Sequence, residues 1–163
     1  MWREMELPPF PGPLRAVLSR LPQYPPAAAL AVLLNLWLGH VLSGRHLPAA
    51  LGKVVCICVR DVGLRLLFRM RDEGVTACAH VPPDLTITAG ANEFLALALR
   101  REDADTLFFS RRLLMEGDTE LGLLVRNTLD ALDPATLKIR IPAPAAALRL
   151  LKLSLLDEPS RGA

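Results

Sequence analysis

Residues 105–133 read DTLFFSRRLLMEGDTELGLLVRNTLDALD, and this stretch says most about the fold. Its pattern predicts a strand near Ser110–Glu116, a tight turn at Gly117-Asp118 and then an amphipathic helix. Glu120 would lie in the first helical turn, where a negative charge favours the helix dipole, and Pro134 would end the helix. The helix prediction rests on apolar residues at helical spacing, namely Leu121, Leu124, Val125, Leu129 and Leu132.

Four runs further upstream are predicted to be strands, at 54–60, 64–71, 75–81 and 85–89. The run Val54–Arg60 is apolar on both faces, as in a central strand. The run Leu64–Arg71 alternates, so that Leu64, Leu66, Phe68 and Met70 share one face and Arg65, Leu67, Arg69 and Arg71 share the other. Short turns between the runs predict an antiparallel meander with its arginine face toward water.

An apolar helix is predicted over Ala27–Ser43, with Pro26 in its first turn and Gly44 as its C-cap. Its uninterrupted apolar core is shorter than the ~20 residues that usually span a bilayer. Asn35, Gly39 and His40 also interrupt the run. We therefore expect a buried or cavity-lining helix, with a membrane anchor as the alternative.

The remaining segments complete an α+β prediction: a five-stranded, mostly antiparallel sheet covered by helices that enclose a hydrophobic cavity. Residues 91–101 are predicted to be helical, with Asn92 as a cap, and Pro142–Leu156 is predicted to be a terminal helix that packs on the domain or lies on a membrane. We expect a proline-rich arm over 1–26, one domain over 27–157 and a flexible tail over 158–163.

The composition is apolar for a soluble chain, with 52% hydrophobic residues, 22% charged residues and a mean hydropathy of +0.31. Such a chain spans a membrane, hides a large apolar surface or encloses apolar cargo. A net charge of +2 without a basic block argues against a nucleic-acid partner. Three cysteines argue against a disulfide framework and fit a reducing cytosol, and the proline-rich N-terminus does not read as a secretory signal.

The polar clusters do not form a recognisable catalytic or metal site. Cys56, Cys58, Cys78 and His80 have an i, i+2 spacing on predicted strands, which is too wide for tetrahedral zinc. His40 and His46 with Ser43 or Ser110 lack a nucleophile elbow. The acidic residues Glu116, Asp118 and Glu120 are explained by turn and cap positions. No catalytic residue, metal ligand or cofactor site is therefore predicted.

The amino-acid sequence of residues 105–133 resembles the UbiT family of sterol-carrier-protein-like domains. The resemblance is carried by DTLFF at 105–109, Arg111-Arg112, EGDTELGL at 116–123, and Asn127 with Leu129-Asp130. It implies a sterol-carrier-protein fold and a non-catalytic accessory factor of oxygen-independent ubiquinone biosynthesis. Such a factor would carry isoprenoid precursors or phospholipids in the cytoplasm, beside the iron-sulfur proteins UbiU and UbiV and with possible contact to the inner membrane.

The candidate cavity walls are apolar residues of the first helix, the 91–101 helix and the 105–133 segment. They are Leu36, Trp37, Phe94, Leu97, Phe108, Phe109, Leu121, Val125 and Leu129. The alternative for each is an ordinary core position, since an amphipathic stripe is first a packing device. A structural adaptor that assembles enzymes without carrying lipid is the second functional hypothesis, with the arginine face as its docking surface. A small enzyme and a membrane-anchored domain are further alternatives.

Overall fold

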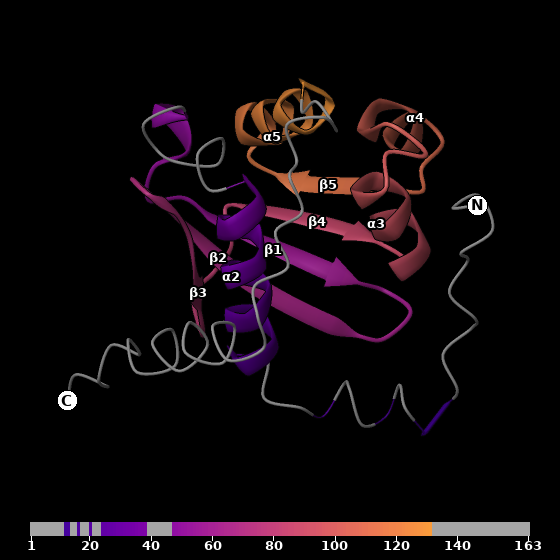
Figure 1. Ribbon diagram of the computed structural model, residues 1–163, viewed down its shortest axis with the longest axis horizontal. Helices are drawn as coiled ribbons and strands as arrows, with labels where there is room; N and C mark the ends of the chain where they lie inside the picture. Colours follow the sequence, from indigo (N-terminus) through magenta and orange to yellow (C-terminus); the bar gives the residue numbers. More distant parts are fainter. Residues whose placement is uncertain (1–11, 14–15, 17–19, 21–23, 39–46, 132–163) are drawn as a thin grey trace.

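A computed structural model describes residues 12–13, 16, 20, 24–38 and 47–131. In chain order the described elements are α2 (Tyr24–Leu38), η1 (Pro48–Ala50), β1 (Val54–Val59), β2 (Leu64–Arg71), β3 (Gly74–Cys78), β4 (Leu85–Ala89), α3 (Ala91–Ala98), α4 (Ala104–Phe109), β5 (Leu114–Gly117) and α5 (Thr119–Ala131). Figure 1 shows these elements, with α2 across the strands and α5 beside β5. The α+β class is confirmed. The proline-rich arm, Gly44 and the predicted terminal helix lie outside the described residues.

The five strands form one mixed sheet in the order β3-β2-β1-β4-β5, so β1 is central as its two apolar faces predict. The pairs β1–β2, β2–β3 and β4–β5 are antiparallel, whereas β4 runs parallel to β1. The prediction of a continuous meander is therefore wrong at β4. Asp84 explains the difference, because its backbone N–H donates to the Val54 carbonyl (2.8 Å) and its carboxylate accepts from the Val54 N–H (2.7 Å). These bonds hold the first residues of β1 and β4 at the same end of the sheet, so the two strands run parallel.

The register separates an inner face from an outer face, because successive side chains of a strand point to opposite sides. The inner face carries the core, with Val55 beside Phe68 and Leu85 in neighbouring strands. The predicted alternation of β2 is confirmed, since Leu66, Phe68 and Met70 are buried while Arg65 and Arg71 are exposed. The helices supply the other half of the core, from Ala27 and Ala31 of α2 to Leu107 of α4 and Leu121 of α5.

Helix α2 packs closely on β2 and β3 because it presents small side chains to them. Ala27, Ala28 and Ala31 are at most 2% exposed. Asn35, one of the polar interruptions in this run, donates from Nδ2 to the Val75 carbonyl (2.6 Å) and accepts at Oδ1 from the Val75 N–H (2.7 Å). Over the described residues, no helix is both long and apolar enough to cross a bilayer.

Two local predictions need correction at α3 and α4. The start of α3 is capped by Asp61, whose Oδ2 accepts from the Ala91 N–H at 2.8 Å, with Gly90 as the N-cap residue in place of the predicted Asn92. The run Asp105–Phe109, which precedes the predicted strand near Ser110–Glu116, forms helix α4, and Asp103 caps this helix by accepting from the Thr106 N–H. The fifth strand is consequently shorter than predicted, at Leu114–Gly117.

Candidate functional site

The inner layer between the sheet and its helices holds the hydrophobic core of the described residues and the half-buried apolar residues packed against it. Helix α2 packs on β3 and β2, whereas α5 packs on β5 and β4, so that central strand β1 lies between the two. Along β1 the inner side chains become more accessible, from Val55, which is 7% exposed, to Ile57 and Val59, which are half-buried. The half-buried apolar residues packed against the core are Leu30, Leu34, Ile57, Ala77, Phe94, Leu97, Met115, Leu124, Val125 and Leu129. We call this set the half-buried layer.

The predicted cavity walls divide into four groups. Phe94, Leu97, Val125 and Leu129 belong to the half-buried layer, whereas Leu121 is only 3% exposed and is core. Phe108 and Phe109 lie instead on α4, where Phe108 is half-buried and Phe109 is 74% exposed. Leu36 and Trp37 lie on α2, but their side chains are outside the described part of the chain.

Phe108 and Phe109 join α4 to α5 through Arg126. Their rings meet edge to face, with centroids 5.7 Å apart. The Arg126 guanidinium carbon lies 4.9 Å from the Phe108 centroid and 5.9 Å from that of Phe109, within the range of cation–π attraction. Asp105 completes the contact, with its Oδ1 2.8 Å from Arg126 Nε. The DTLFF run thus forms a helix–helix junction.

Asp130 strengthens the same junction from the end of α5. Its Oδ1 accepts from the Ala104 N–H at 3.0 Å, which satisfies a donor at the start of α4, and its carbonyl accepts from Arg100 Nη2 at 3.4 Å. The sequence patterns do not predict this junction, because they predict a strand near Ser110–Glu116 and no helix before it. The signal in the sequence that could have predicted α4 is Asp103, an aspartate at the N-cap position directly before Ala104, Asp105 and Thr106.

The Gly117-Asp118 turn has the role that the sequence predicts. Gly117 has a φ of +118°, and a Cβ at this position would collide with the Asp84 carbonyl oxygen. Asp118 accepts at Oδ1 from the Leu121 N–H (3.0 Å), which caps α5, and its Oδ2 lies 3.2 Å from Lys53 Nζ. The Leu121 N–H and Lys53 both hold the pKa of Asp118 below its usual range. Its carboxylate is therefore occupied by structural contacts.

Gly122 allows α5 to approach the sheet. A Cβ on this buried glycine would lie 3.5 Å from Leu85 Cδ1 and 3.9 Å from Met115 Sδ, which are ordinary contact distances. The close neighbour of Gly122 is thus the sheet itself.

The cysteines lie on the outer face of the sheet. Cys56 Sγ and Cys58 Sγ are 3.8 Å apart, closer than the strand spacing predicts, but the register places Leu67 between Cys56 and Cys78. Among the described residues, no three His, Cys, Asp or Glu side chains gather in an arrangement able to hold a metal ion. Burial raises the pKa of the Cys56 thiol, and Cys58 adds to this effect while Arg65 opposes it.

Ser110, a candidate nucleophile in the sequence, directs its hydroxyl to the end of α4. Its Oγ donates to the carbonyls of Thr106 (2.8 Å) and Leu107 (3.2 Å). His80 is exposed at the end of β3, while His40, Ser43 and His46 lie outside the described residues. In the described part of the chain, the apolar inner layer is therefore a better candidate site than any polar cluster.

The model of the SCP-2 sterol transfer family matches residues 38–130, which is more than half of the chain. The chain belongs to this family. The match begins at the end of α2, includes all five strands and ends within α5. Membership in the SCP-2 family agrees with the predicted sterol-carrier-protein fold.

The chain is also similar to the ubiquinone biosynthesis accessory factor UbiT of Escherichia coli strain K12, with 38% identity over 106 residues. This alignment covers 65% of the chain and 57% of the relative, so the chain spans little more than half the length of the curated proteins it matches. Among solved structures, the UbiJ-SCP2 ubiquinone synthesis protein matches with a TM-score of 0.49 and 22% identity, over 64% of this chain and 92% of the other. Palmitated SCP2L2 from Aedes aegypti matches with a TM-score of 0.48 and 14% identity, over 63% of this chain and 91% of the other.

Proposed function

We propose that this protein is a non-catalytic, lipid-binding accessory factor of oxygen-independent ubiquinone biosynthesis. The observation that carries the proposal is the 38% identity to UbiT over 106 residues, within a chain of the SCP-2 family. The cargo is an isoprenoid intermediate or a phospholipid, held in the cytoplasm for other biosynthetic proteins, among them iron-sulfur partners of the UbiU and UbiV type.

The half-buried layer is the proposed contact surface for the cargo. It combines aliphatic side chains of α2, β1 and α5 with Phe94 and Leu97 of α3. A polyprenyl or acyl chain gains about 25 cal/mol for each Å² of apolar surface removed from water, and it needs no specific polar partner along its length. Residues that are apolar yet incompletely buried can supply such contacts by moving apart, whereas the fully buried core around Leu85 and Leu107 cannot do so without opening the fold.

The polar groups next to this layer support a carrier in preference to a catalyst. Asp118 caps α5 and contacts Lys53, and Asp130 caps α4. The Ser110 hydroxyl donates a hydrogen bond to the Thr106 carbonyl at the end of α4. General acid–base catalysis requires a group free to reach a substrate atom. Each of these three groups is already engaged by the fold.

The proposal is tested by the ubiquinone content of cells that lack the gene. We expect ubiquinone to fall in cultures grown without oxygen, to stay normal in aerated cultures, and to recover when the wild-type gene is restored. Unchanged ubiquinone under both conditions would exclude the proposed role. An equal fall with and without oxygen would retain a biosynthetic role but exclude its oxygen-independent character.

A further inference from the structure

The outer face of the sheet carries a row of arginines along β2. Arg65, Arg69 and Arg71 share this face, since side chains two residues apart on a strand point the same way. The row is about 20 Å long at ~3.3 Å per residue. The described helices that pack on the sheet contribute to the inner core, so among the described residues no helix covers the arginine row.

Among the described residues, the arginine row differs from Lys53, Arg112 and Arg126 in its lack of carboxylate partners. Lys53 contacts Asp118, Arg112 contacts Glu93 and Glu102, and Arg126 contacts Asp105. Within the described ranges, by contrast, the three arginines of the row form no ion pair. Their polar contacts are neutral: Arg69 Nη1 donates to the Gly52 carbonyl (3.3 Å), and Arg71 Nε lies 3.5 Å from Thr76 Oγ1.

The strands beside the row do not neutralise it. The outer positions of β1, β3 and β4 that pair in the sheet are uncharged: Val54, Cys56, Cys58, Gly74, Thr76, Cys78, Thr86 and Thr88. Among the paired outer positions the acidic residue is Glu116 on β5, three strands from β2. At ~4.8 Å per strand this separation is about 14 Å, which exceeds the Debye length of ~8 Å at physiological salt. The acidic residues next to the row in the chain are Asp72 and Glu73 of the β2–β3 turn, beside Arg71. The three arginines outnumber these two carboxylates, so the row keeps a net positive charge toward solvent.

We propose that the arginine row is a docking surface for the anionic phosphates of a lipid bilayer. Guanidinium groups match phosphate oxygens with two parallel hydrogen bonds, and a bilayer offers phosphates at every position along the row. An acidic protein is the other possible anionic partner. Stable protein interfaces usually have an apolar core rich in aromatic residues, however, and the paired outer positions include no aromatic side chain.

Docking through this face leaves α2, α3 and α5 on the side away from the bilayer. The half-buried layer then stays accessible to other proteins while the chain is held at the membrane. This inference does not depend on the proposed function, because charge and placement alone carry it.

The test is sedimentation with vesicles of phosphatidylglycerol and phosphatidylcholine, and with vesicles of phosphatidylcholine alone. We expect binding to the anionic vesicles only, with an affinity that falls as salt is added. The double variant Arg65→Gln/Arg71→Gln should lower the partition coefficient about thirty-fold, since each arginine near an anionic surface contributes about a factor of five. The variant Arg65→Lys/Arg71→Lys should retain most of the binding.

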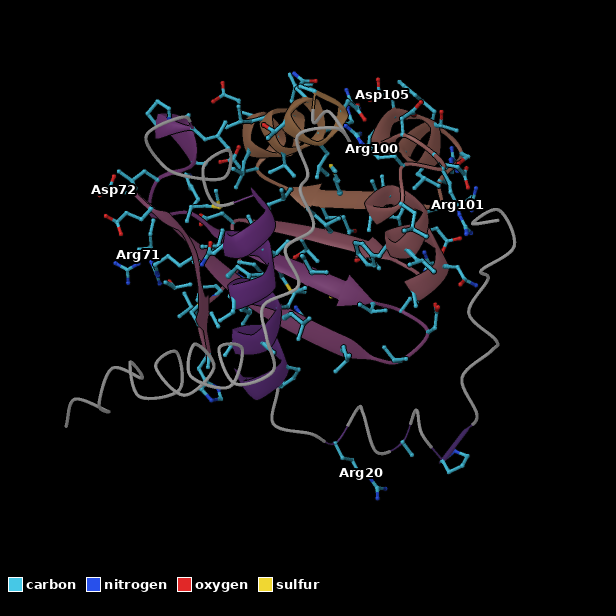
Figure 2. All side chains as sticks on the ribbon, viewed as in Figure 1. Arg20, Arg71, Asp72, Arg100, Arg101 and Asp105 are labelled. Carbon is cyan, nitrogen blue, oxygen red and sulfur yellow. The ribbon has the colours of Figure 1, made fainter. Side chains whose placement is uncertain are left out.

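The matched control is Arg100→Gln/Arg111→Gln, which removes the same charge from the α3 and α4 ends. Figure 2 shows Arg100 beside the α4–α5 junction and Arg71 at the far side of the molecule. Equal losses in the two double variants would overturn the proposal, as would failure of the wild-type protein to bind anionic vesicles. Binding to poly-glutamate without binding to anionic vesicles would overturn the lipid assignment in favour of an acidic protein. Circular dichroism of each variant separates lost binding from lost folding.

Discussion

The side-chain amide of Asn35 makes both of its hydrogen bonds with the backbone of a single residue, Val75. The amide donates to the Val75 carbonyl at 2.6 Å and accepts from the Val75 N–H at 2.7 Å, so it occupies the open edge of β3 as a neighbouring strand would. Gly74 leaves room for this contact, because a Cβ there would collide with Asn35 Oδ1. A polar residue in an apolar helix thus fixes α2 to the sheet and closes one edge to further pairing.

Replacing Asn35 with alanine should therefore destabilise the fold. The change removes two hydrogen bonds and leaves the Val75 backbone groups partly buried without partners, which costs about 2–3 kcal/mol in the free energy of unfolding. Chemical denaturation monitored by circular dichroism measures this loss. The control Asn127→Ala changes an exposed asparagine of α5 and should stay within about 0.5 kcal/mol of wild type. Similar effects of the two substitutions would mean that the Asn35–Val75 contact contributes little.

Two glycines of the 105–133 region should respond in opposite directions to alanine. Gly117→Ala places a side chain at a φ of +118° against the Asp84 carbonyl, and we expect a loss of about 2–3 kcal/mol. Gly122→Ala adds a methyl group at ordinary contact distance from Leu85 inside α5, and the higher helix propensity of alanine should stabilise the fold by up to about 1 kcal/mol. Thermal unfolding of both variants checks the prediction, which fails if the two shifts in Tm have the same sign.

The Asp105–Arg126 pair should show a measurable coupling energy. Asp105 is 53% exposed at its side chain and Arg126 only 19%, so solvent screens one partner more than the other. A double-mutant cycle of Asp105→Ala and Arg126→Ala should give about 0.5–1 kcal/mol. Arg126→Ala alone should cost more than Asp105→Ala, because it also removes the contact with the Phe108 and Phe109 rings. Strictly additive single effects would show that the ion pair is not energetically coupled.

Asp118 should make the stability of the fold depend on acid pH. Its pKa is lowered from 3.8 by the hydrogen bond from the Leu121 N–H and by Lys53, so its contribution is present above pH ~4 and disappears as the pH falls further. The variant Asp118→Asn lacks this titration. We expect wild type to be more stable than the variant at neutral pH, with the difference in Tm shrinking below pH 4. A difference that stays constant down to pH 3 would contradict this assignment.

Local sequence patterns predicted the elements whose signals lie within one segment. The alternation of Leu66, Phe68 and Met70 with arginines placed both faces of β2, and Gly117-Asp118 located the turn before α5. The parallel pairing of β4 could not be read in this way, because it depends on Asp84 reaching Val54, thirty residues earlier in the chain. Similarly, Asp105 and Arg126 make a contact across twenty-one positions that helical or strand periodicity does not encode. The candidate walls on α3 and α5 followed from amphipathic spacing, whereas Phe108 and Phe109 lie on α4, a helix that the sequence patterns do not predict.

The proposed lipid cargo can be sought in the purified protein itself. Organic extraction of protein prepared without detergent, followed by mass spectrometry, should yield isoprenoid or phospholipid in a stoichiometric amount. Val125→Phe enlarges a side chain of the half-buried layer and should lower the yield, whereas Leu123→Phe, on the exposed side of the same helix, should leave it unchanged. Protein that is consistently empty, or that carries the same amount of lipid in all three forms, would contradict cargo binding in the half-buried layer.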